Sequence, residues 1–369
     1  MDRVRGLQQT GRCENGMTER RRMLIYVAGA SKQASPKTAI SLLRYCPREV
    51  TGLLDPENVG KTAAELFGVG GALPVVGSVE TAPADTNMLT LGMAPVGGKL
   101  PASWMPPIEA AVSRGWDVLA GTHDFLSNNA RLRQLAASSG SRLIDARKPP
   151  DALGCNGLGA LKTRAVRVLT VGTDCDIGKM TVAWELHRAL QARGLNTGFA
   201  ATGQTGIMVS GGGIAVDAVV ADYIAGAAEQ LVVAEAARDV VVVEGQGSIS
   251  SPLYSGVSLG LLHGVAPDAM ILCHDPWRTA MVGTPDWRVP DPAESVAWHE
   301  NVAAMVHPAK VVGIAINGRF RPVETVRARA RAIAAQTGLP TTDVLAMGST
   351  PLVQALHSVC EGVRPLEEQ

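Results

Sequence analysis

The sequence predicts an α/β protein with two domains, a Rossmann-like domain followed by a doubly wound P-loop domain. Short apolar runs alternate with helix-like stretches along the chain, and this alternation is typical of parallel sheets covered by helices. A glycine-rich segment ending at Lys179 lies between the apolar run 166–171 and a helical stretch that begins at Val182. A strand, a glycine-rich loop and a helix in this order indicate a site for phosphate groups.

The length of 369 residues and the hydrophobic content of 46% suit two domains that each bury a core. We predict a Rossmann-like domain over 23–148, a linker over 149–165 and a P-loop domain over 166–369. The boundary follows the connector 147–157, where proline and glycine are dense enough to stop helices and central strands. Residues 1–22 are rich in arginine and lack hydrophobic periodicity, so we interpret them as a disordered leader or a start codon placed too early.

The apolar runs predict the individual elements. In the first domain we expect strands at 23–28, 50–54, 88–91, 117–120 and 142–144. In the second we expect strands at 166–171, 197–201, 240–244, 269–273, 311–316 and 342–345, with helices at 182–193, 217–237, 293–306 and 323–336. Ligands of such sheets bind beyond the carboxyl ends of the strands. Residues that directly follow strands are therefore the candidate site residues.

Charge and composition exclude several classes of function. The 34 basic residues equal the 34 acidic ones, and aromatic residues make up only 4% of the chain. A basic stripe with interleaved aromatic side chains, which a nucleic-acid binder needs, is missing from the sequence. We therefore expect small anionic molecules as partners and no nucleic acid.

Membrane and metal-binding signatures are also missing from the sequence. No apolar segment approaches the roughly 20 residues that span a bilayer, and none resembles the apolar centre of a signal peptide. The six cysteines are scattered without a C-x-x-C pair, so neither a zinc site nor a disulfide framework is indicated. We expect a soluble protein of the reducing cytoplasm that binds no metal and forms a homo-oligomer.

The first domain carries only weak signals. Residues 29–35 follow the first strand and Asp55 ends the second, as in a dinucleotide site, but the G-x-G-x-x-G spacing is absent. Without those glycines the backbone cannot approach a pyrophosphate closely, so we do not expect NAD binding. Asp55 equally suits a surface turn. Glycines at 92–98 and His123 also follow strands and can line a cleft, although a packed or capping role suits His123 equally well.

The glycine-rich loop of the second domain carries the strongest signal. Backbone N–H groups, the positive end of the helix dipole and a lysine converge there on a diphosphate. The loop departs from the usual pattern because five residues separate its glycines and a methionine stands where Ser or Thr normally holds Mg²⁺. We expect the cofactor to be held by Gly172, Thr173, Asp174, Cys175, Gly178, Lys179, Met180 and Thr181.

Two more segments that follow strands offer polar groups. Thr202, Gln204 and Thr205 supply neutral hydrogen bonds after the strand at 197–201. Asp217 and Asp222 come later, and they either activate an amine or organise a cation; alternatively, Asp217 is the N-cap of the next helix.

Glu244 ends a strand of four valines, in the position where nucleotide-binding folds place an acidic group facing the phosphate site. Burying a carboxylate there is costly without a task, so we expect a base or a holder of metal or water. The alternative is a partly exposed strand end. Gln246 and Ser248 follow and supply hydrogen bonds near the same ligand.

The last candidates follow later in the chain. His263 and His274 are candidate bases, although a histidine beside apolar residues is often simply packed. Arg278 is suited to hold a carboxylate with two parallel hydrogen bonds. Asn317 follows a strand where a purine ring would be recognised, and a plain turn asparagine is the alternative.

The motifs resemble two known families. The loop 172–179 together with Val243-Glu244-Gly245 is similar to dethiobiotin synthetase, an ATP-dependent ligase with the same gap between the glycines. A closer resemblance is to the DgcN family, whose named members are D-glutamate N-acetyltransferases. It covers the chain from about Met23 onward and is carried by the segments 172–181, 201–207, 216–222, 244–248 and 256–264.

The DgcN resemblance implies acetyl-CoA as donor, a fold unlike the usual acetyltransferase fold, and a product that passes to a racemase. An amino acid acceptor would bind near Thr202, Gln204, Gln246, Ser248, His274 and Arg278, with Arg288 as a second candidate for its carboxylates. Glu244, Asp217 or His263 would take the proton from the α-amine, and backbone amides near 245–247 would stabilise the oxyanion.

Other mechanisms stay open from the sequence. Cys175 can carry the acetyl group transiently, or it is merely small enough for a tight loop. An ATP- and Mg²⁺-dependent ligase or kinase of the dethiobiotin synthetase type is the main alternative, since Thr181 can replace the missing hydroxyl if the helix start shifts by one residue. A nucleotide-sensing regulatory protein is another.

Overall fold

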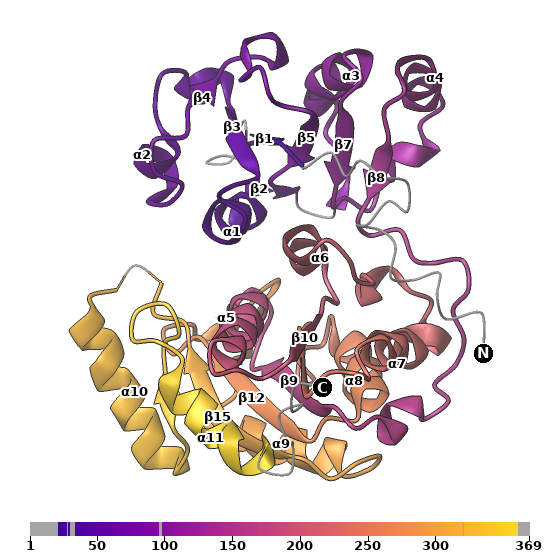
Figure 1. Ribbon diagram of the computed structural model, residues 1–369. Coiled ribbons are helices and arrows are strands. Elements are labelled where there is room, and N and C mark those ends of the chain that lie inside the picture. Colours follow the sequence, from indigo (N-terminus) through magenta and orange to yellow (C-terminus); the bar gives the residue numbers. More distant parts are fainter. Residues whose placement is uncertain (1–20, 28, 30–33, 96–97, 320, 361–369) are drawn as a thin grey trace. The chain divides into compact units, whose positions relative to one another are not determined.

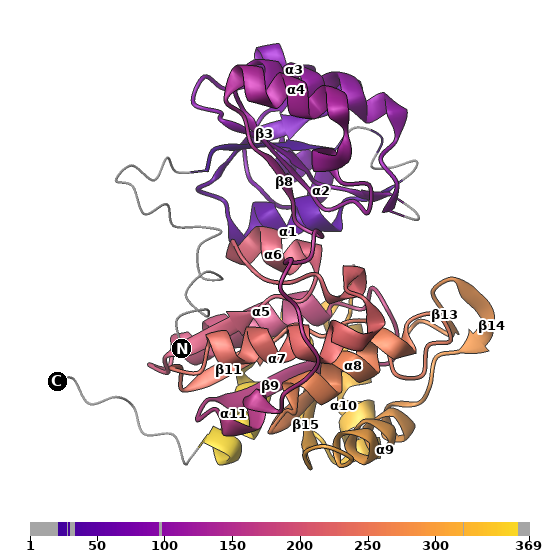
Figure 2. The same ribbon diagram turned by 90° about the vertical axis from the view of Figure 1, so that its right-hand side faces the viewer.

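The computed structural model describes residues 21–27, 29, 34–95, 98–319 and 321–360 (Figures 1 and 2). Its contacts divide the chain into two compact units. The amino-terminal unit holds the described residues up to Pro149 together with Ile207–Ala218, and the carboxy-terminal unit holds Pro150–Gly206 and the residues from Val219 onward. The leader expected at 1–22 lies outside the described residues except for its last two.

The amino-terminal unit is built on a parallel six-stranded sheet in the order β4-β3-β1-β5-β7-β8. When the six strands are numbered 1 to 6 along the chain, their order in the sheet is 3-2-1-4-5-6, which is the Rossmann arrangement. The strands are β1 (Met23–Tyr26), β3 (Val50–Leu54), β4 (Val75–Val76), β5 (Met88–Leu91), β7 (Asp117–Ala120) and β8 (Leu143–Asp145). A small antiparallel pair joins β2 (Ala34–Ser35) to β6 (Ala94–Pro95).

Helices cover both faces of this sheet (Figure 1). The core on one face joins alternate strand residues to side chains of α3 and α4, among them Ile108 and Leu132. The other face is covered by α1, whose Ala39 lies close to Ile25. The helices are α1 (Lys37–Tyr45), α2 (Ala63–Phe67), α3 (Met105–Ser113) and α4 (Ala130–Ser139).

The carboxy-terminal unit has a second parallel six-stranded sheet, in the order β10-β11-β9-β12-β15-β16. The third strand of the unit along the chain, β11, therefore lies beside its first, β9. Residues that follow these two strands meet at one edge of the sheet. The strands are β9 (Val166–Gly172), β10 (Thr197–Ala200), β11 (Val240–Val243), β12 (Ala269–His274), β15 (Lys310–Ile316) and β16 (Thr341–Thr342).

Two separate cores hold helices against this sheet. On one face Val168, Val242 and Ile271 pack against Leu186 of α5 and Leu352 of α11. On the other face the core includes residues of α7, α8, α9 and α10. The helices are α5 (Lys179–Gln191), α6 (Gln204–Ser210), α7 (Ile224–Ala234), α8 (Ser255–Val265), α9 (Pro292–Ala303), α10 (Val323–Thr337) and α11 (Thr350–Cys360). The predicted fold class, with a Rossmann-like and a P-loop sheet, is confirmed.

Several element boundaries differ from those expected. The helix expected at 217–237 begins only at Ile224, because 3₁₀ turns occupy the preceding residues. The strand expected at 342–345 ends at Thr342, because the Asp343 carboxylate accepts hydrogen bonds from the backbone of Gly318, Leu345 and Ala346 and turns the chain.

Some elements had no clear signal in the sequence. The antiparallel hairpin of β13 (Ala280–Met281) and β14 (Thr284–Arg288) is one example. Helix α8 is another, since its glycines obscure the helical pattern. A Cβ atom at Gly264 would lie 2.1 Å from the carbonyl oxygen of Ala225, so this glycine allows α8 to pack closely on α7.

The segment Ile207–Ala218 lies within the range expected for the second domain, but its contacts place it in the amino-terminal unit. The Cys46 thiol donates to the carbonyl of Val209 at 3.6 Å, and Arg21 donates to the carbonyl of Met208 at 3.0 Å. An ion pair between Arg147 and Asp217 fixes the far end of the segment. Within the described residues, the chain thus passes between the units three times.

Candidate functional site: a phosphate loop at the carboxyl edge of the sheet

The loop between β9 and α5 folds tightly around the base of the Lys179 side chain. Asp176 and Gly178 have positive φ angles of 53° and 102°, and glycine at the second position avoids the strain of a left-handed backbone. A Cβ atom at Gly172 would lie 3.1 Å from Lys179 Nζ. The ammonium donates to the carbonyl oxygen of Asp174 at 2.7 Å and is largely buried. A positive charge is therefore held at the mouth of the loop.

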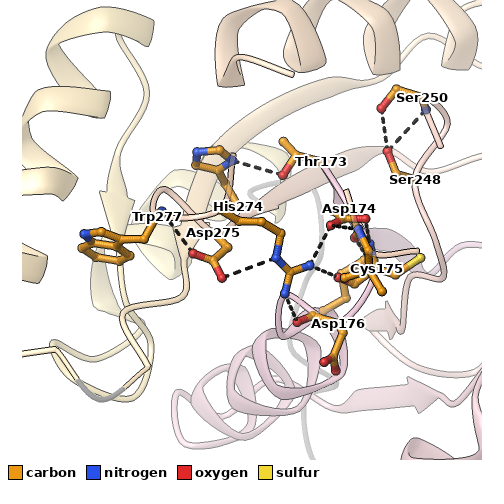
Figure 3. A network of polar contacts seen from close by, with 12 residues as sticks. Thr173, Asp174, Cys175, Asp176, Ser248, Ser250, His274, Asp275 and Trp277 are labelled. Carbon is orange, nitrogen blue, oxygen red and sulfur yellow. Dashed lines mark hydrogen bonds and ion pairs between the residues drawn. The ribbon is translucent and has the colours of Figure 1, made fainter. Parts of the chain in front are cut away.

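Arg278, which follows β12, binds the loop at Asp174, Cys175 and Asp176, which are labelled in Figure 3. Its Nη1 donates to the Asp174 carboxylate at 2.7 Å and to the carbonyl of Cys175 at 2.6 Å, and its Nη2 donates to the carbonyl of Asp176 at 3.2 Å. The C=O and N–H of a trans peptide unit point in opposite directions. The amide N–H groups of Asp176 and Ile177 consequently point away from the arginine, as in an anion-binding nest.

Asp174 links this loop to the hairpin. Its carboxylate is 1% exposed and accepts from the backbone N–H groups of Cys175 at 2.7 Å and Val282 at 3.0 Å, in addition to Arg278. We expected Arg278 to hold the carboxylates of an acceptor. In the structure its guanidinium group is engaged by Asp174 and by the loop carbonyls, so its contacts are those of a support for the loop.

Glu244 follows β11 directly and lies beside the loop because β11 neighbours β9. The side chain is buried, and its Oε2 accepts from the backbone N–H groups of Thr202 and Gly203, both at 3.1 Å. Thr202 Oγ1 donates to the Glu244 carbonyl at 2.6 Å and accepts from Gln246 Nε2 at 3.1 Å. The expected cluster of Glu244, Thr202 and Gln246 is therefore brought together.

The first turn of α6 leaves space for this carboxylate only because it contains glycine. A Cβ atom at Gly206 would lie 2.1 Å from Glu244 Oε2. Gln204 begins this helix, and Thr205 is buried within it. Gly203 and Gly206 thus give room to the Glu244 side chain.

His274 ends β12 next to the loop. Its Nδ1 lies 3.0 Å from the hydroxyl oxygen of Thr173, and Thr173 N–H donates to the carbonyl of Cys273 at 3.1 Å. Burial lowers the pKa of His274 to about 4. The ring is therefore neutral at pH 7 and joins the phosphate loop to the neighbouring strand.

A pH dependence of stability follows from this low pKa. The unfolded chain takes up a proton at His274 near pH 6.5, whereas the folded protein does so only near pH 4. Stability from this group is thus present above pH 6.5 and is lost as the pH falls toward 4, by up to about 3 kcal/mol. We expect the urea midpoint of His274→Gln to fall less between pH 6.5 and 4 than that of the wild type. His357→Gln, a change at an exposed site, should show the same fall as the wild type. An equal slope in wild type and His274→Gln would contradict the burial argument.

A small cavity lies behind the loop. It measures about 10 Å³, enough for one water molecule at most, and is lined by Thr170, Gly172, Gly245, Gln246, Ser248 and His299 among others. His299 of α9 was not expected at the site. Its Nδ1 lies 2.7 Å from the carbonyl oxygen of Ser295, and burial lowers its pKa to about 4. A lone helical histidine gives no sequence signal, since only tertiary packing brings it to the cavity.

The loop after β15 completes the rim of the site. A Cβ atom at Gly178 would lie 3.7 Å from Asn317 Nδ2, so Asn317 lies beside the end of the phosphate loop, as expected of a residue near a purine ring. Arg319, two residues later, was not predicted. Its Nη2 donates to the carbonyl of Asp176 at 3.1 Å, and its Nε lies 3.2 Å from Asp275.

Two other expected catalytic residues make contacts elsewhere within their own units. Asp217 lies in a 3₁₀ turn of the amino-terminal unit, where it pairs with Arg147, and it does not cap an α-helix. His263 lies in the last turn of α8, with Nε2 3.4 Å from the carbonyl oxygen of Val302 in α9. Helix α8 leads back to the amino end of β12, away from the strand ends that carry the loop. Within the carboxy-terminal unit, the placement of the side chains favours Glu244 over His263.

Other candidates of the sequence have structural roles. Asp55 caps a turn, with its carboxylate accepting from Glu57 N–H at 3.0 Å, which matches the surface-turn interpretation. Burial is the main cause that lowers the pKa of His123, with the nearby Arg147 adding to it. Most of the glycine segment 29–35 lies outside the described residues.

Ser248 is buried and pairs with Ser250 at 2.9 Å, and Met180 and Thr181 lie half-buried in the first turn of α5.

Within the described residues, no helix is both long enough and apolar enough to cross a membrane.

Arg288, the second candidate for an acceptor carboxylate, lies at the end of the β13–β14 hairpin, where it pairs with Glu294 at 3.1 Å. Both side chains are largely exposed.

Comparisons with known proteins cover both units. A family model described as a P-loop domain of unknown function, DUF1611, matches residues 154–353, and its Rossmann-like partner matches residues 56–149. A protein from Tritonibacter scottomollicae named D-glutamate N-acetyltransferase is 34% identical over 91% of this chain and 98% of its own length. A protein of the same name from a Pseudoalteromonas species is 37% identical over 75% of this chain and 83% of its own length.

A solved structure agrees with the fold. The crystal structure of a DUF1611 family protein from Anabaena variabilis is 34% identical, covers 92% of this chain and 99% of its own, and superposes with a TM-score of 0.87. The resemblance inferred from the sequence motifs is confirmed by the names of both relatives. The chain belongs to the DUF1611 family, with a Rossmann-like domain followed by a P-loop domain.

Proposed function

We propose that this protein is an N-acetyltransferase that moves an acetyl group from acetyl-CoA to the α-amine of D-glutamate or a related D-amino acid. Two relatives at 34% and 37% identity carry the name of this activity. The observation that carries the proposal is the composition of the loop. It keeps the nest and Lys179 that bind a diphosphate, but it has Met180 where phosphoryl transfer would need a hydroxyl ligand for Mg²⁺.

The residues present fit the diphosphate of coenzyme A. The amides of Asp176 and Ile177 point away from Arg278, and Lys179 supplies a largely buried positive charge whose ammonium donates to the carbonyl oxygen of Asp174. A Cβ atom at Gly172 would lie 2.9 Å from Ile177 and 3.1 Å from Lys179 Nζ, so this glycine leaves room for the ammonium group at the loop. Acetyl-CoA supplies the activated thioester, and the diphosphate stays whole.

The chain supplies orientation and a proton acceptor. An α-ammonium group must lose a proton before its nitrogen attacks a thioester, and a positioned carboxylate accelerates that step. Glu244 is held in one orientation by Thr202 and Gly203, beside the loop that binds the donor. Gln246 and the backbone N–H groups of residues 246 and 247 would donate to the oxyanion, whereas the Gly245 N–H already donates to Thr170 Oγ1.

Replacing Glu244 by glutamine tests this role. We expect kcat to fall by about 100-fold or more, because the amide keeps the shape and accepts from Thr202 and Gly203 but cannot take a proton. Binding of coenzyme A should change by less than about threefold. The matched control is Glu235→Gln, an ion pair with Arg238 on the surface. Unchanged turnover in Glu244→Gln would remove this residue from the chemistry.

The activity itself is tested by following free thiol. The protein is incubated with acetyl-CoA and a panel of D- and L-amino acids, and a parallel reaction contains ATP and Mg²⁺ instead. We expect thiol release that depends on an amino acid, is fastest with a D-amino acid, and needs no ATP. Release of ADP or phosphate without thiol release would favour a ligase or kinase of the dethiobiotin synthetase type.

A further inference from the structure

Arginines concentrate on the rim of the phosphate loop, on the segments that follow β12 and β15. Acidic side chains lie among them: Asp174 and Asp275 are buried, and Asp176 is exposed in the loop itself. Three aspartates offset only part of the charge of four guanidinium groups. The arginines are Arg278, Arg319, Arg321 and Arg329.

Of the four arginines, Arg321 and Arg329 make the fewest polar contacts in the described part of the chain. Arg321 lies over the ring of Trp277, with its Cζ 5.3 Å from the ring centroid, and makes no ion pair with an acidic side chain of the described residues. Arg329 donates to the carbonyl of Pro276 at 3.3 Å. Stacking on the tryptophan leaves the edge of the Arg321 guanidinium group available for further hydrogen bonds.

Arg319 is held in a conformation that L-residues rarely adopt. Its φ angle is +46°, although neither glycine nor asparagine stands there. The side chain reaches back to the carbonyl of Asp176 in the phosphate loop, yet 47% of it is exposed. Strained backbone that places a charged group is a feature of functional sites. The strain here directs a guanidinium group to the rim of the loop.

This rim lies where the nucleoside part of a bound nucleotide must leave the loop. The nest and Lys179 take the diphosphate, and Asn317, beside Gly178, marks the side toward the base. Arg319 follows Asn317 by two residues. The nucleotide part of coenzyme A differs from ADP by a phosphate monoester on the ribose 3′-oxygen, which calls for cationic donors at this position.

We propose that Arg319 and Arg321 form a subsite for the ribose 3′-phosphate of coenzyme A, and that this subsite lets a loop shaped for any nucleoside diphosphate select coenzyme A. The inference rests on the proposed function. Planar guanidinium groups bind phosphate with two parallel hydrogen bonds, which gives geometric selectivity as well as affinity. Arg278 and Asp275 fix the position of the subsite relative to the loop.

The test compares coenzyme A with dephospho-coenzyme A, which lacks only the 3′-phosphate, by isothermal titration calorimetry on the full chain. We expect the wild type to bind coenzyme A at least about tenfold more tightly. In Arg319→Asn with Arg321→Ala this preference is lost, because affinity for coenzyme A falls while affinity for dephospho-coenzyme A stays within about twofold. Asparagine is chosen at 319 because it tolerates a positive φ angle.

Arg327→Ala is the matched control, since this arginine pairs with the exposed Glu324 on α10 and should keep the full preference. Melting temperatures of all variants report whether the fold is retained. A preference that survives in the double variant, or equal binding of both ligands by the wild type, would overturn the subsite and leave the acetyltransferase proposal standing. Failure of the wild type to bind either ligand would overturn both.

Discussion

Replacing Lys179 by methionine is expected to weaken binding of coenzyme A by about 100-fold and to lower kcat/KM by a similar factor or more. Methionine keeps the apolar stem that packs near Gly172 and Gly245 but removes the ammonium group. Lys179 is largely buried, so its charge acts in a region where water screens little. Calorimetry with coenzyme A and the thiol-release assay measure the two effects.

The matched control is Lys310→Met. Lys310 is an exposed residue at the start of β15 and pairs with Glu300. Wild-type affinity and turnover are expected for this variant. Wild-type affinity for coenzyme A in Lys179→Met would mean that the diphosphate is held elsewhere.

Replacing Gly245 by alanine is expected to lower the free energy of unfolding of the carboxy-terminal unit by about 3 kcal/mol. The added Cβ atom would lie 1.7 Å from the carbonyl oxygen of Thr170, so either β9 or the turn after Glu244 must move. That backbone also donates to Thr170 Oγ1 at 2.9 Å, and this bond would be strained. Thermal unfolding should show a fall of roughly 6–12 °C.

Gly256→Ala provides the comparison. It lies in the first turn of α8, and a Cβ atom added there has no neighbour within 4 Å. Its stability should stay within about 1 kcal/mol of the wild type. If both alanine variants melted like the wild type, the tight contact between β9 and the turn after β11 would be contradicted.

The strands and the phosphate loop were predictable because their signals are local. Four consecutive valines at 240–243 can only be a buried strand, and Lys179 after Gly178 identifies the loop from composition alone. Glu244 was predictable for the same reason, since a carboxylate that ends such a strand faces the edge where parallel strands bind ligands. The strand order was not predictable in this way, since the same alternation of strands and helices gives 3-2-1-4-5-6 in one sheet and 2-3-1-4-5-6 in the other.

Long-range contacts were not predictable from single segments. Arg278 suits a carboxylate clamp by residue type, but the Asp174 carboxylate that engages it lies 104 residues earlier in the chain. Asp217 was expected to activate an amine, organise a cation or cap a helix, whereas the structure pairs it with Arg147 in the amino-terminal unit, which also holds the rest of Ile207–Ala218. Arg319 was missed because its signal is a backbone angle and not a motif.

A crystal structure of the complex with acetyl-CoA tests the central claim most directly. We predict an intact diphosphate whose oxygens lie about 3 Å from the amide nitrogens of Asp176 and Ile177 and from Lys179 Nζ. An empty loop, with Lys179 still bonded to the Asp174 carbonyl and the cofactor bound elsewhere, would contradict it.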